Sequence, residues 1–291
     1  MEHTIKNEKL KIEIAEYGAE MRSIKANNIE LLWQSDEKTW KNRATNLFPH
    51  VGRLTDGKYT YNGTTYEMPL HGFVKLSTLT VTNKEENTIT FTLTDNEETR
   101  KMYPFSFKYD VKYTLEGNVL HNEYIIKNTG NDVMYFAVGG HPGFITPAIE
   151  SLKFEDYYIE FEKGVEPQEI IFSDAKFPTD KTKPLVLDNG KLHLTQSLFD
   201  NDAIVFKNVG NKISLATDLS AAKLEMDIKD FQYLGLWNFP MVDVKYVCIE
   251  PWTTLPARDG VVEDFATQPD MITLNKNEEK RYCFSMTFDN F

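Results

Sequence analysis

The chain of 291 residues has few of the residues that mark several large classes of protein. Its two cysteines, Cys248 and Cys283, form no Cys-x-x-Cys pair, so neither a disulfide framework nor a cysteine-rich zinc site is expected, and both should be reduced and buried. Lys and Arg number 32 against 44 Asp and Glu, a net charge of −12. Because basic residues supply most of the affinity for phosphate backbones, this balance argues against a nucleic-acid-binding protein.

Long apolar runs and nucleotide-binding motifs are also missing. No stretch of about 18 apolar residues occurs, and charges recur every few positions from the first residue, so neither a membrane span nor a signal peptide is expected. The patterns Gly-x-Gly-x-x-Gly, Gly-x-x-x-x-Gly-Lys-Ser/Thr and Gly-x-Ser-x-Gly are absent. We therefore expect a cytoplasmic monomer or homodimer that uses no cofactor or metal and binds neither nucleic acid nor membrane.

What the sequence does contain is the alternation of β-strands. Apolar residues occupy every second position over residues 105–115, and Leu120, Asn122, Tyr124 and Ile126 continue the alternation after a break at Gly117-Asn118. The same period over residues 79–93 predicts a second hairpin, and Asn62-Gly63 between two tyrosine-rich segments predicts a third. The chain is therefore predicted to be all-β, with antiparallel strands throughout.

Helical periodicity is almost absent from the chain. Only residues 36–41 and 97–102 are candidates for short helices. The strand rhythm never changes to a new composition, and no linker rich in Pro, Gly or Ser interrupts it. We therefore predict one domain over residues 1–291, folded as a large antiparallel β-sandwich with very few short helices.

Three of the six histidines lie beside glycine or proline at expected strand ends, namely His50, His71 and His141. Glycine lets a backbone pass close to a ligand, and loops on a rigid scaffold commonly hold binding groups. His141 lies in Gly-Gly-His-Pro-Gly, which also suits a simple tight turn. Both a structural and a functional interpretation of His141 stay open at this point.

Two acidic residues lie at the ends of apolar strands. Glu250 closes the segment KYVCIE and is followed by Pro251-Trp252. A carboxylate in that setting is either a satisfied structural acid or a general base whose basicity is raised by partial desolvation. Asp202 opens an apolar strand, where an Asx turn is the simpler interpretation. A zinc site built from the three histidines and Glu250 is conceivable, but no pair has the spacing typical of zinc ligands.

Together these motifs resemble the aldose 1-epimerases, or galactose mutarotases, and most closely the mutarotase-like proteins found near bacterial lactose-utilisation genes. The resemblance covers nearly the whole chain and rests on four segments in family order: VGRLTDGKYTYNGTTYEMPLHGF, GGHPGF, LFDNDAIVF and CIEPWT. It implies the galactose-mutarotase supersandwich. It also implies an isomerase that interconverts the α and β anomers of a free hexose, such as galactose or glucose, with no metal or nucleotide.

The resemblance also implies roles for individual residues. Glu250 would be the general base at the C1 hydroxyl of the sugar, and His141 the general acid at the ring oxygen. His71 would help to hold or polarise the ring oxygen, while Arg53 and Asp202 would bind sugar hydroxyls. Trp237 or Trp252 would provide an aromatic platform for the sugar ring.

The chain departs from the family pattern at three places. Gly52 stands where the pattern has Asn, Phe73 follows His71-Gly72 where the pattern has a second Gly, and Pro142-Gly143-Phe144 replaces a longer aromatic run. These departures bear on the identity of the sugar more than on the fold or the type of reaction.

Three alternative functions remain open. The segment HGFVK is similar to the HGFAR-like segment of hexose-6-phosphate mutarotases, so Lys75 with Arg53, and with Arg43 or Arg258, would hold a phosphate. A catalytically silent sugar-binding protein on the same fold is a second alternative. A glycoside hydrolase, the third, would need a pair of carboxylates, for which Asp202 and Glu250 are the only candidates.

Overall fold

The computed structural model, which describes residues 1–291, is built on one large antiparallel sheet of nine strands. Neighbouring strands pair antiparallel across the whole sheet, including the predicted long hairpin of residues 107–128. The strand order is β17 (Lys191–His193), β14 (Tyr158–Phe161), β19 (Lys212–Ala216), β20 (Lys223–Asp227), β24 (Glu279–Asp289), β11 (Val119–Asn128), β10 (Phe107–Glu116), β9 (Thr88–Thr94) and β8 (Thr80–Lys84).

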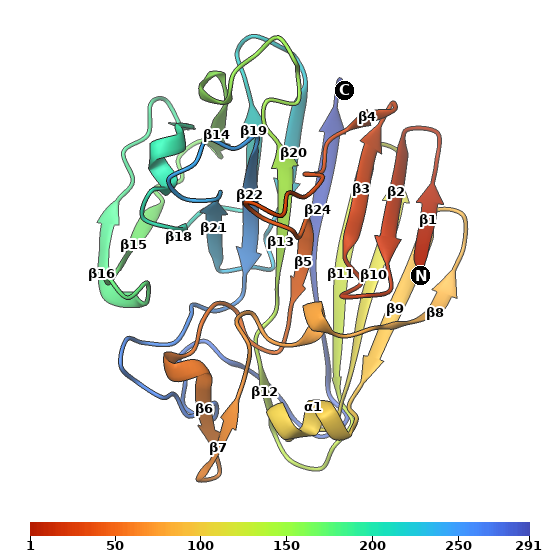
Figure 1. Cartoon of the computed structure of the whole chain (residues 1–291), viewed down its shortest axis with the longest axis vertical. Coiled ribbons are helices and arrows are strands. Elements are labelled where there is room, and N and C mark those ends of the chain that lie inside the picture. Colours follow the sequence, from red (N-terminus) through yellow and green to blue (C-terminus); the bar gives the residue numbers. More distant parts are fainter.

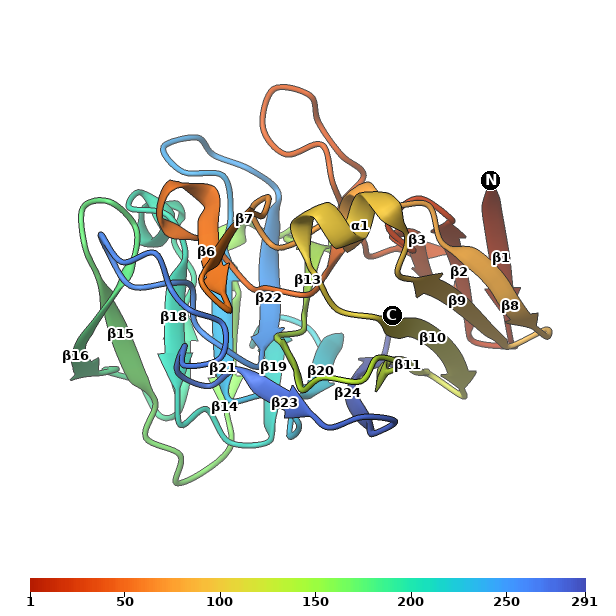
Figure 2. The same cartoon turned by 90° about the horizontal axis from the view of Figure 1, so that it is seen from below.

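Two further antiparallel sheets form the second layer. A seven-stranded sheet has the order β16 (Pro178–Pro184), β15 (Gln168–Phe172), β18 (Ile204–Lys207), β21 (Tyr233–Trp237), β22 (Tyr246–Trp252), β13 (Gly139–Ile145) and β5 (Ala44–Leu47). A four-stranded sheet consists of β1 (Glu2–Lys6), β2 (Leu10–Ala15), β3 (Met21–Ala26) and β4 (Ile29–Glu30). Figures 1 and 2 show these two sheets side by side, facing the nine-stranded sheet.

The layers are joined by a continuous apolar core. A cluster of 60 buried residues draws on all three sheets and runs from Ile5 to Phe288, which favours the predicted single domain. A few buried hydrogen bonds cross the layers as well: the Tyr124 hydroxyl donates to Asn46 Oδ1 at 2.9 Å, and the Tyr113 hydroxyl donates to the carbonyl of Ala19 at 2.8 Å. The predicted antiparallel β-sandwich is therefore confirmed.

Short elements complete the fold. The hairpin of β6 (Lys58–Tyr61) and β7 (Thr64–Glu67) turns at Asn62-Gly63 as predicted, and β12 (Met134–Phe136) pairs with β23 (Ile272–Leu274). Helix α1 (Glu97–Met102) is the predicted short helix, capped by the side chain of Asn96. The 3₁₀ turns are η1 (Thr55–Gly57), η2 (Val74–Leu76), η3 (Phe154–Asp156) and η4 (Gln196–Phe199). No helix is long and apolar enough to cross a membrane.

The second predicted helix, over residues 36–41, is wrong. This segment is a loop in which the carboxylate of Asp36 accepts a hydrogen bond from the amide of Lys38, and Ser35 has a positive φ of 77°. The amide of Asp36 in turn donates to the carbonyl of Trp40. These local bonds hold the backbone in turns that a helix cannot contain.

Both cysteines are free, as predicted, but only Cys248 is fully buried. Cys283 is partly exposed because it alternates on β24 with Phe284 and Met286, which fill the core, so its thiol lies on the opposite face of the sheet. The prediction that both cysteines are buried is therefore wrong for Cys283.

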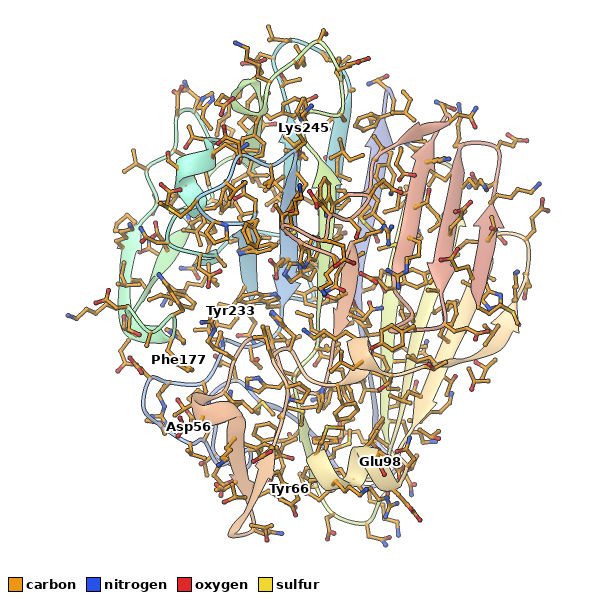
Figure 3. The ribbon with its side chains drawn as sticks, viewed as in Figure 1. Asp56, Tyr66, Glu98, Phe177, Tyr233 and Lys245 are labelled. Atoms are coloured by element: carbon orange, nitrogen blue, oxygen red, sulfur yellow. The ribbon has the colours of Figure 1, made fainter.

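The buried side chains of the 60-residue cluster fill the space between the layers. Figure 3 shows the side chains on the ribbon, face-on to the sheets. The candidate site lies instead on the outer face of the seven-stranded sheet. Strand β22 illustrates how the sequence produces this arrangement: Val247 and Ile249 belong to the core, whereas the alternate residues Tyr246, Cys248 and Glu250 point to the opposite face.

Candidate active site

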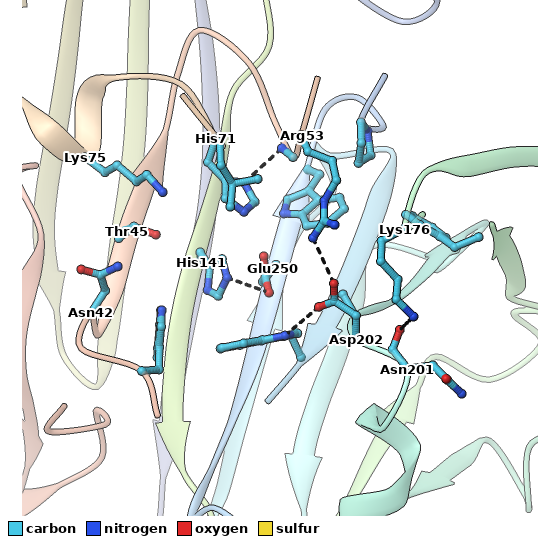
Figure 4. Close-up of a pocket in the computed structure, with 18 residues that line it drawn as sticks. Asn42, Thr45, Arg53, His71, Lys75, His141, Lys176, Asn201, Asp202 and Glu250 are labelled. Atoms are coloured by element: carbon cyan, nitrogen blue, oxygen red, sulfur yellow. Dashed lines mark hydrogen bonds and ion pairs between the residues drawn. The ribbon is translucent and has the colours of Figure 1, made fainter. Parts of the chain in front are cut away.

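Two adjacent strands bring a histidine and a glutamate into contact. His141 lies on β13 and Glu250 on β22, and His141 Nε2 is 3.1 Å from Glu250 Oε1. The side chain of His141 is 10% exposed and that of Glu250 only 1%, so both lie at the floor of the site (Figure 4). We call these two residues the His–Glu pair.

Burial shifts the pKa of each member of the His–Glu pair toward its neutral form. Removal from water is the main reason that the pKa of Glu250 lies well above its usual value, and the negative charge of Asp202 adds to this rise. Burial likewise lowers the pKa of His141 to about 3, and the positive charge of Lys75 contributes to this decrease. These two shifts favour one proton on the pair as a whole, carried by Glu250 beside a neutral His141 at a distance of 3.1 Å.

His71 is held in a single tautomer by the backbone. Its Nδ1 accepts a hydrogen bond from the amide of Gly52 at 3.0 Å, so the ring proton must lie on Nε2. Burial is the main cause of a pKa for His71 well below the usual value, which keeps the ring neutral. His71 can therefore donate a hydrogen bond from Nε2 to a ligand.

The turn that presents His71 needs glycine at the next position. His71 itself has a positive φ of 62°, and Gly72 follows with a φ of +74°. A Cβ atom added at Gly72 would lie 2.1 Å from the carbonyl oxygen of Phe48, which no side chain allows. The His-Gly dipeptide is therefore a backbone requirement of this site.

Arg53, Asp202 and Trp237 form a second polar group in the pocket. Arg53 Nη2 donates to Asp202 Oδ2 at 3.0 Å, and Trp237 Nε1 donates to Asp202 Oδ1 at 3.0 Å. Both oxygens of Asp202 are thus held by donors, and the expected Asx turn is not formed. With a positive φ of 84° as well, Asp202 has the strained backbone often found in functional sites.

All these residues line one cavity of about 350 Å³. Sequence reasoning found His71, Lys75, His141 and Glu250 as well as Arg53, Asp202 and the two tryptophans Trp237 and Trp252, all of which line the cavity. It missed further lining residues from distant loops and strands, among them Trp40, Asn42, Thr45, Phe172, Lys176 and Asn201. No local pattern marks these residues, because they reach the pocket only through the tertiary fold.

Some sequence expectations are corrected by the structure. His50 does not line the cavity; it is buried against the ring of Phe265 and hydrogen-bonded to Gln268 at 3.0 Å, so it does not join a zinc site with the other two histidines. Neither Arg43 nor Arg258 lines the cavity. Arg43 donates to the carbonyl of Gln34, and Arg258 pairs with Glu263. Trp252 is only 3% exposed and belongs to an apolar cluster, which leaves Trp237 as the more accessible ring.

The donor set of the site suits proton transfer better than other chemistry. His141, Cys248 and Glu250 are close enough to share an ion, but binding one would require the buried Cys248 thiol, whose pKa lies well above its usual value, to lose its proton. A glycoside hydrolase needs two carboxyl groups that flank the scissile bond. Here Glu250 has a histidine partner, and Asp202 is engaged by Arg53 and Trp237.

Comparisons with known proteins give the same class as the fold and the pocket, a galactose mutarotase-like β-sandwich. A galactose mutarotase related enzyme from Lactobacillus acidophilus shares 36% identity with a TM-score of 0.94, covering 100% of this chain and 98% of that one. A galactose mutarotase-like protein from Lactobacillus casei shares 29% identity with a TM-score of 0.93, covering 99% and 100%. A putative aldose 1-epimerase from Escherichia coli, with 13% identity and a TM-score of 0.78, shares the fold over 99% of each chain.

The sequence comparisons identify the family. The model of the aldose 1-epimerase family matches residues 1–287. Protein LacX of Lactococcus lactis subsp. lactis is 32% identical over 268 residues, which is 86% of this chain and 87% of LacX. The chain belongs to the aldose 1-epimerase family.

Proposed function

We propose that the protein interconverts the α and β anomers of a free hexose, such as galactose or glucose. The observation that supports this most directly is the contact of 3.1 Å between His141 and Glu250 at the floor of a polar pocket. Anomer exchange moves one proton off the C1 hydroxyl and another onto the ring oxygen. Both oxygens are bonded to C1, so an acid and a base that touch each other can serve both atoms at once.

In the proposed mechanism, the one proton of the His–Glu pair, which burial favours on Glu250 in the free protein, moves to His141 when the sugar binds, so that Glu250 becomes a carboxylate. Glu250 takes the proton from the C1 hydroxyl, and His141 gives its proton to the ring oxygen. The bond between C1 and the ring oxygen breaks, and the open-chain aldehyde forms. After rotation about the C1–C2 bond, the ring oxygen attacks the other face of the carbonyl, and both protons return in the reverse direction.

The other polar residues hold the sugar in place for this exchange. His71, with its proton fixed on Nε2, donates to the ring oxygen or to a hydroxyl. The guanidinium of Arg53 and the carboxylate of Asp202 offer donors and acceptors to the sugar hydroxyls, and Trp237 supplies an aromatic wall.

The direct test is the loss of optical rotation by freshly dissolved α-galactose and α-glucose. Wild type should accelerate this change, and Glu250→Gln should remove the acceleration while sugar binding in a calorimeter persists. Glu263→Gln is the matched control, because Glu263 is another buried glutamate but lies outside the pocket, and it should keep the wild-type rate. A folded Glu250→Gln variant with the wild-type rate would exclude Glu250 as the base. Sugar binding without any acceleration by wild type would favour a silent carbohydrate-binding protein.

A phosphorylated hexose is the second candidate substrate, and Lys75 is the observation that favours it. Lys75 lines the cavity, and its ammonium group takes part in none of the hydrogen bonds or ion pairs of the protein (Figure 4). Burial lowers its pKa, since no acceptor compensates the lost water. Lys176 also lines the cavity, but its Nζ donates to the carbonyl of Asn201 at 3.0 Å.

The two lysines therefore provide a matched test of the substrate. If Lys75 binds a phosphate, Lys75→Met should raise KM for α-glucose 6-phosphate by about 10- to 100-fold and leave KM for glucose nearly unchanged. This range corresponds to the free energy of one hydrogen bond between charged groups. Lys176→Met should affect both sugars little. Equal effects of Lys75→Met on the two sugars would favour the free hexose.

A further inference from the structure

The loop of residues 35–41 delivers Trp40 to the candidate site. The carbonyl of Trp40 accepts hydrogen bonds from the indole of Trp33 at 2.9 Å and from the amide of Asp36 at 3.0 Å. The hydroxyl of Ser35 closes the same loop by donating to the carbonyl of Lys41. The backbone at Trp40 is thus fixed on two sides, which gives its indole a defined position in the pocket wall.

Gly143 provides the space for this indole. A Cβ atom at Gly143, on β13, would lie 2.7 Å from Cζ3 of Trp40 and 3.2 Å from the sulfur of Cys248. Real Cβ atoms do not approach another carbon as closely as 2.7 Å, so the indole crosses the strand only because position 143 has no side chain. This position is one of the departures from the family pattern, and His141 lies two residues before it on the same strand.

The imidazole of His141 is held by rings on three sides. Its centroid lies 4.9 Å from the indole of Trp40 at an angle of 30°, and 5.6 Å from both Trp237 and His71 at steep angles. Its Nδ1 is buried and has no hydrogen-bond partner. A functional histidine is usually oriented by a hydrogen bond on its second ring nitrogen. Because His141 lacks this hydrogen bond, the packed rings of its three neighbours must fix the orientation of its imidazole.

We infer that Trp40 is a positioning residue that holds the imidazole of His141 against Glu250. The absence of a side chain at Gly143 leaves the space that the indole of Trp40 occupies. This inference rests on the proposed function for its effect on rate. The indole face, tilted by 30° from the imidazole, also stabilises the imidazolium that the reaction requires, because the face of an aromatic ring attracts a cation. Trp40 thus takes the place of the hydrogen bond that Nδ1 lacks.

The first test separates positioning from sugar binding. Loss of alignment by about 1 Å can cost up to about a hundredfold in rate, so Trp40→Leu should lower kcat by roughly 10- to 100-fold with KM within about twofold of wild type. Trp40→Phe retains an aromatic face and should recover most of the loss. A raised KM with unchanged kcat would overturn the inference, because Trp40 would then act as a platform for the sugar.

The second test asks whether Gly143 acts through Trp40. Gly143→Ala alone should reduce kcat about as much as Trp40→Leu, because the added methyl displaces the indole. In the Trp40→Leu background the same methyl meets a smaller side chain, so it should have little further effect. If Gly143→Ala costs the same in both backgrounds, it acts through Cys248 or the strand, and the inference is overturned.

A structural measurement keeps the inference independent of the proposed function. If wild type accelerates no sugar, the proposed function fails, and crystal structures of Trp40→Leu and Trp40→Phe decide the positioning role. A rotated imidazole that has left Glu250 in the leucine variant but not in the phenylalanine variant would support it. An unchanged contact between His141 and Glu250 in the leucine variant would refute it.

Discussion

Replacement of Glu250 by glutamine should change how the stability of the protein depends on pH. Glu250 is 1% exposed, and burial holds its pKa well above the usual value. The folded protein therefore retains a proton on this group at pH values where the unfolded chain has released it. Glutamine has the same shape and no charge, so Glu250→Gln removes this linkage between protonation and folding without opening a cavity.

The sign and size of the effect follow from the two pKa directions in the His–Glu pair. Glu250 has an unfolded pKa near 4.5 and a raised folded pKa, so its contribution stabilises the protein at low pH and is lost as the pH rises through that interval. His141 falls from 6.5 to about 3 on folding, so its contribution has the opposite slope below pH 6.5 and is constant above it. Above about pH 6.5 Glu250 is the member of the pair whose protonation can still differ between the folded and unfolded states, so the free energy of unfolding should fall as the pH rises, by at most about 1.4 kcal/mol per pH unit, for as long as the folded protein keeps the proton.

The assay is urea unfolding of wild type and Glu250→Gln in steps from pH 6.5 to 8.5, with midpoint and slope fitted at each pH. The difference in unfolding free energy between the two proteins should change with pH in favour of the variant. Glu263→Gln serves as the control, because Arg258 lowers the pKa of Glu263, whose stabilising contribution is therefore complete throughout this range. A constant difference between wild type and Glu250→Gln across the range would refute the reasoning.

Three further predictions concern the turn, the sugar contacts and the pH profile. Gly72→Ala should destabilise the protein by more than about 4 kcal/mol in urea unfolding, because the added Cβ would meet the carbonyl oxygen of Phe48. Gly63→Ala is the control: Gly63 also has a φ of +74°, but nothing lies within 4 Å of its added Cβ, so this variant should lose only about 1 kcal/mol. Equal losses of stability in the two variants would contradict the prediction. Arg53→Ala should raise KM more than it lowers kcat and also release Asp202, and an unchanged KM would exclude the assigned role. The rate should be highest near neutral pH, where the His–Glu pair holds one proton, and a rate that is flat from pH 5 to 9 would contradict the proposed exchange.

The sequence predicted most of the fold because alternation is a local property. Each strand of the hairpin over residues 107–128 buries every second side chain, so its pattern needs no knowledge of the rest of the chain. The loop at residues 36–41 shows the limit of such reasoning. Its charged residues are compatible with a helix, but side-chain bonds from Asp36 and Ser35 to nearby backbone groups favour turns instead.

The candidate site was predictable where a residue lies within a distinctive segment, and not elsewhere. His141 and Glu250 stand in short segments that resemble the family, and the structure brings them into contact. Trp40 and Lys176 lie in loops without such segments, and their place in the pocket depends on how distant strands pair. His50 illustrates the opposite error, since its neighbours resemble those of His71, yet its side chain turns toward Phe265 and away from the cavity.

The three departures from the family pattern lie in different surroundings in the structure. At Gly52, with a φ of +73°, an added Cβ would lie 2.4 Å from Cγ of Pro256, so an asparagine could enter only if that proline moved. Phe73 is 1% exposed and packs in the core, and Gly143 admits Trp40. Gly52 and Pro256 both line the pocket, Phe73 does not, and Gly143 affects the pocket wall only through the indole of Trp40. A change at Gly52 should therefore modify selection among sugars, whereas a change at Gly143 should act on proton exchange through Trp40 and His141.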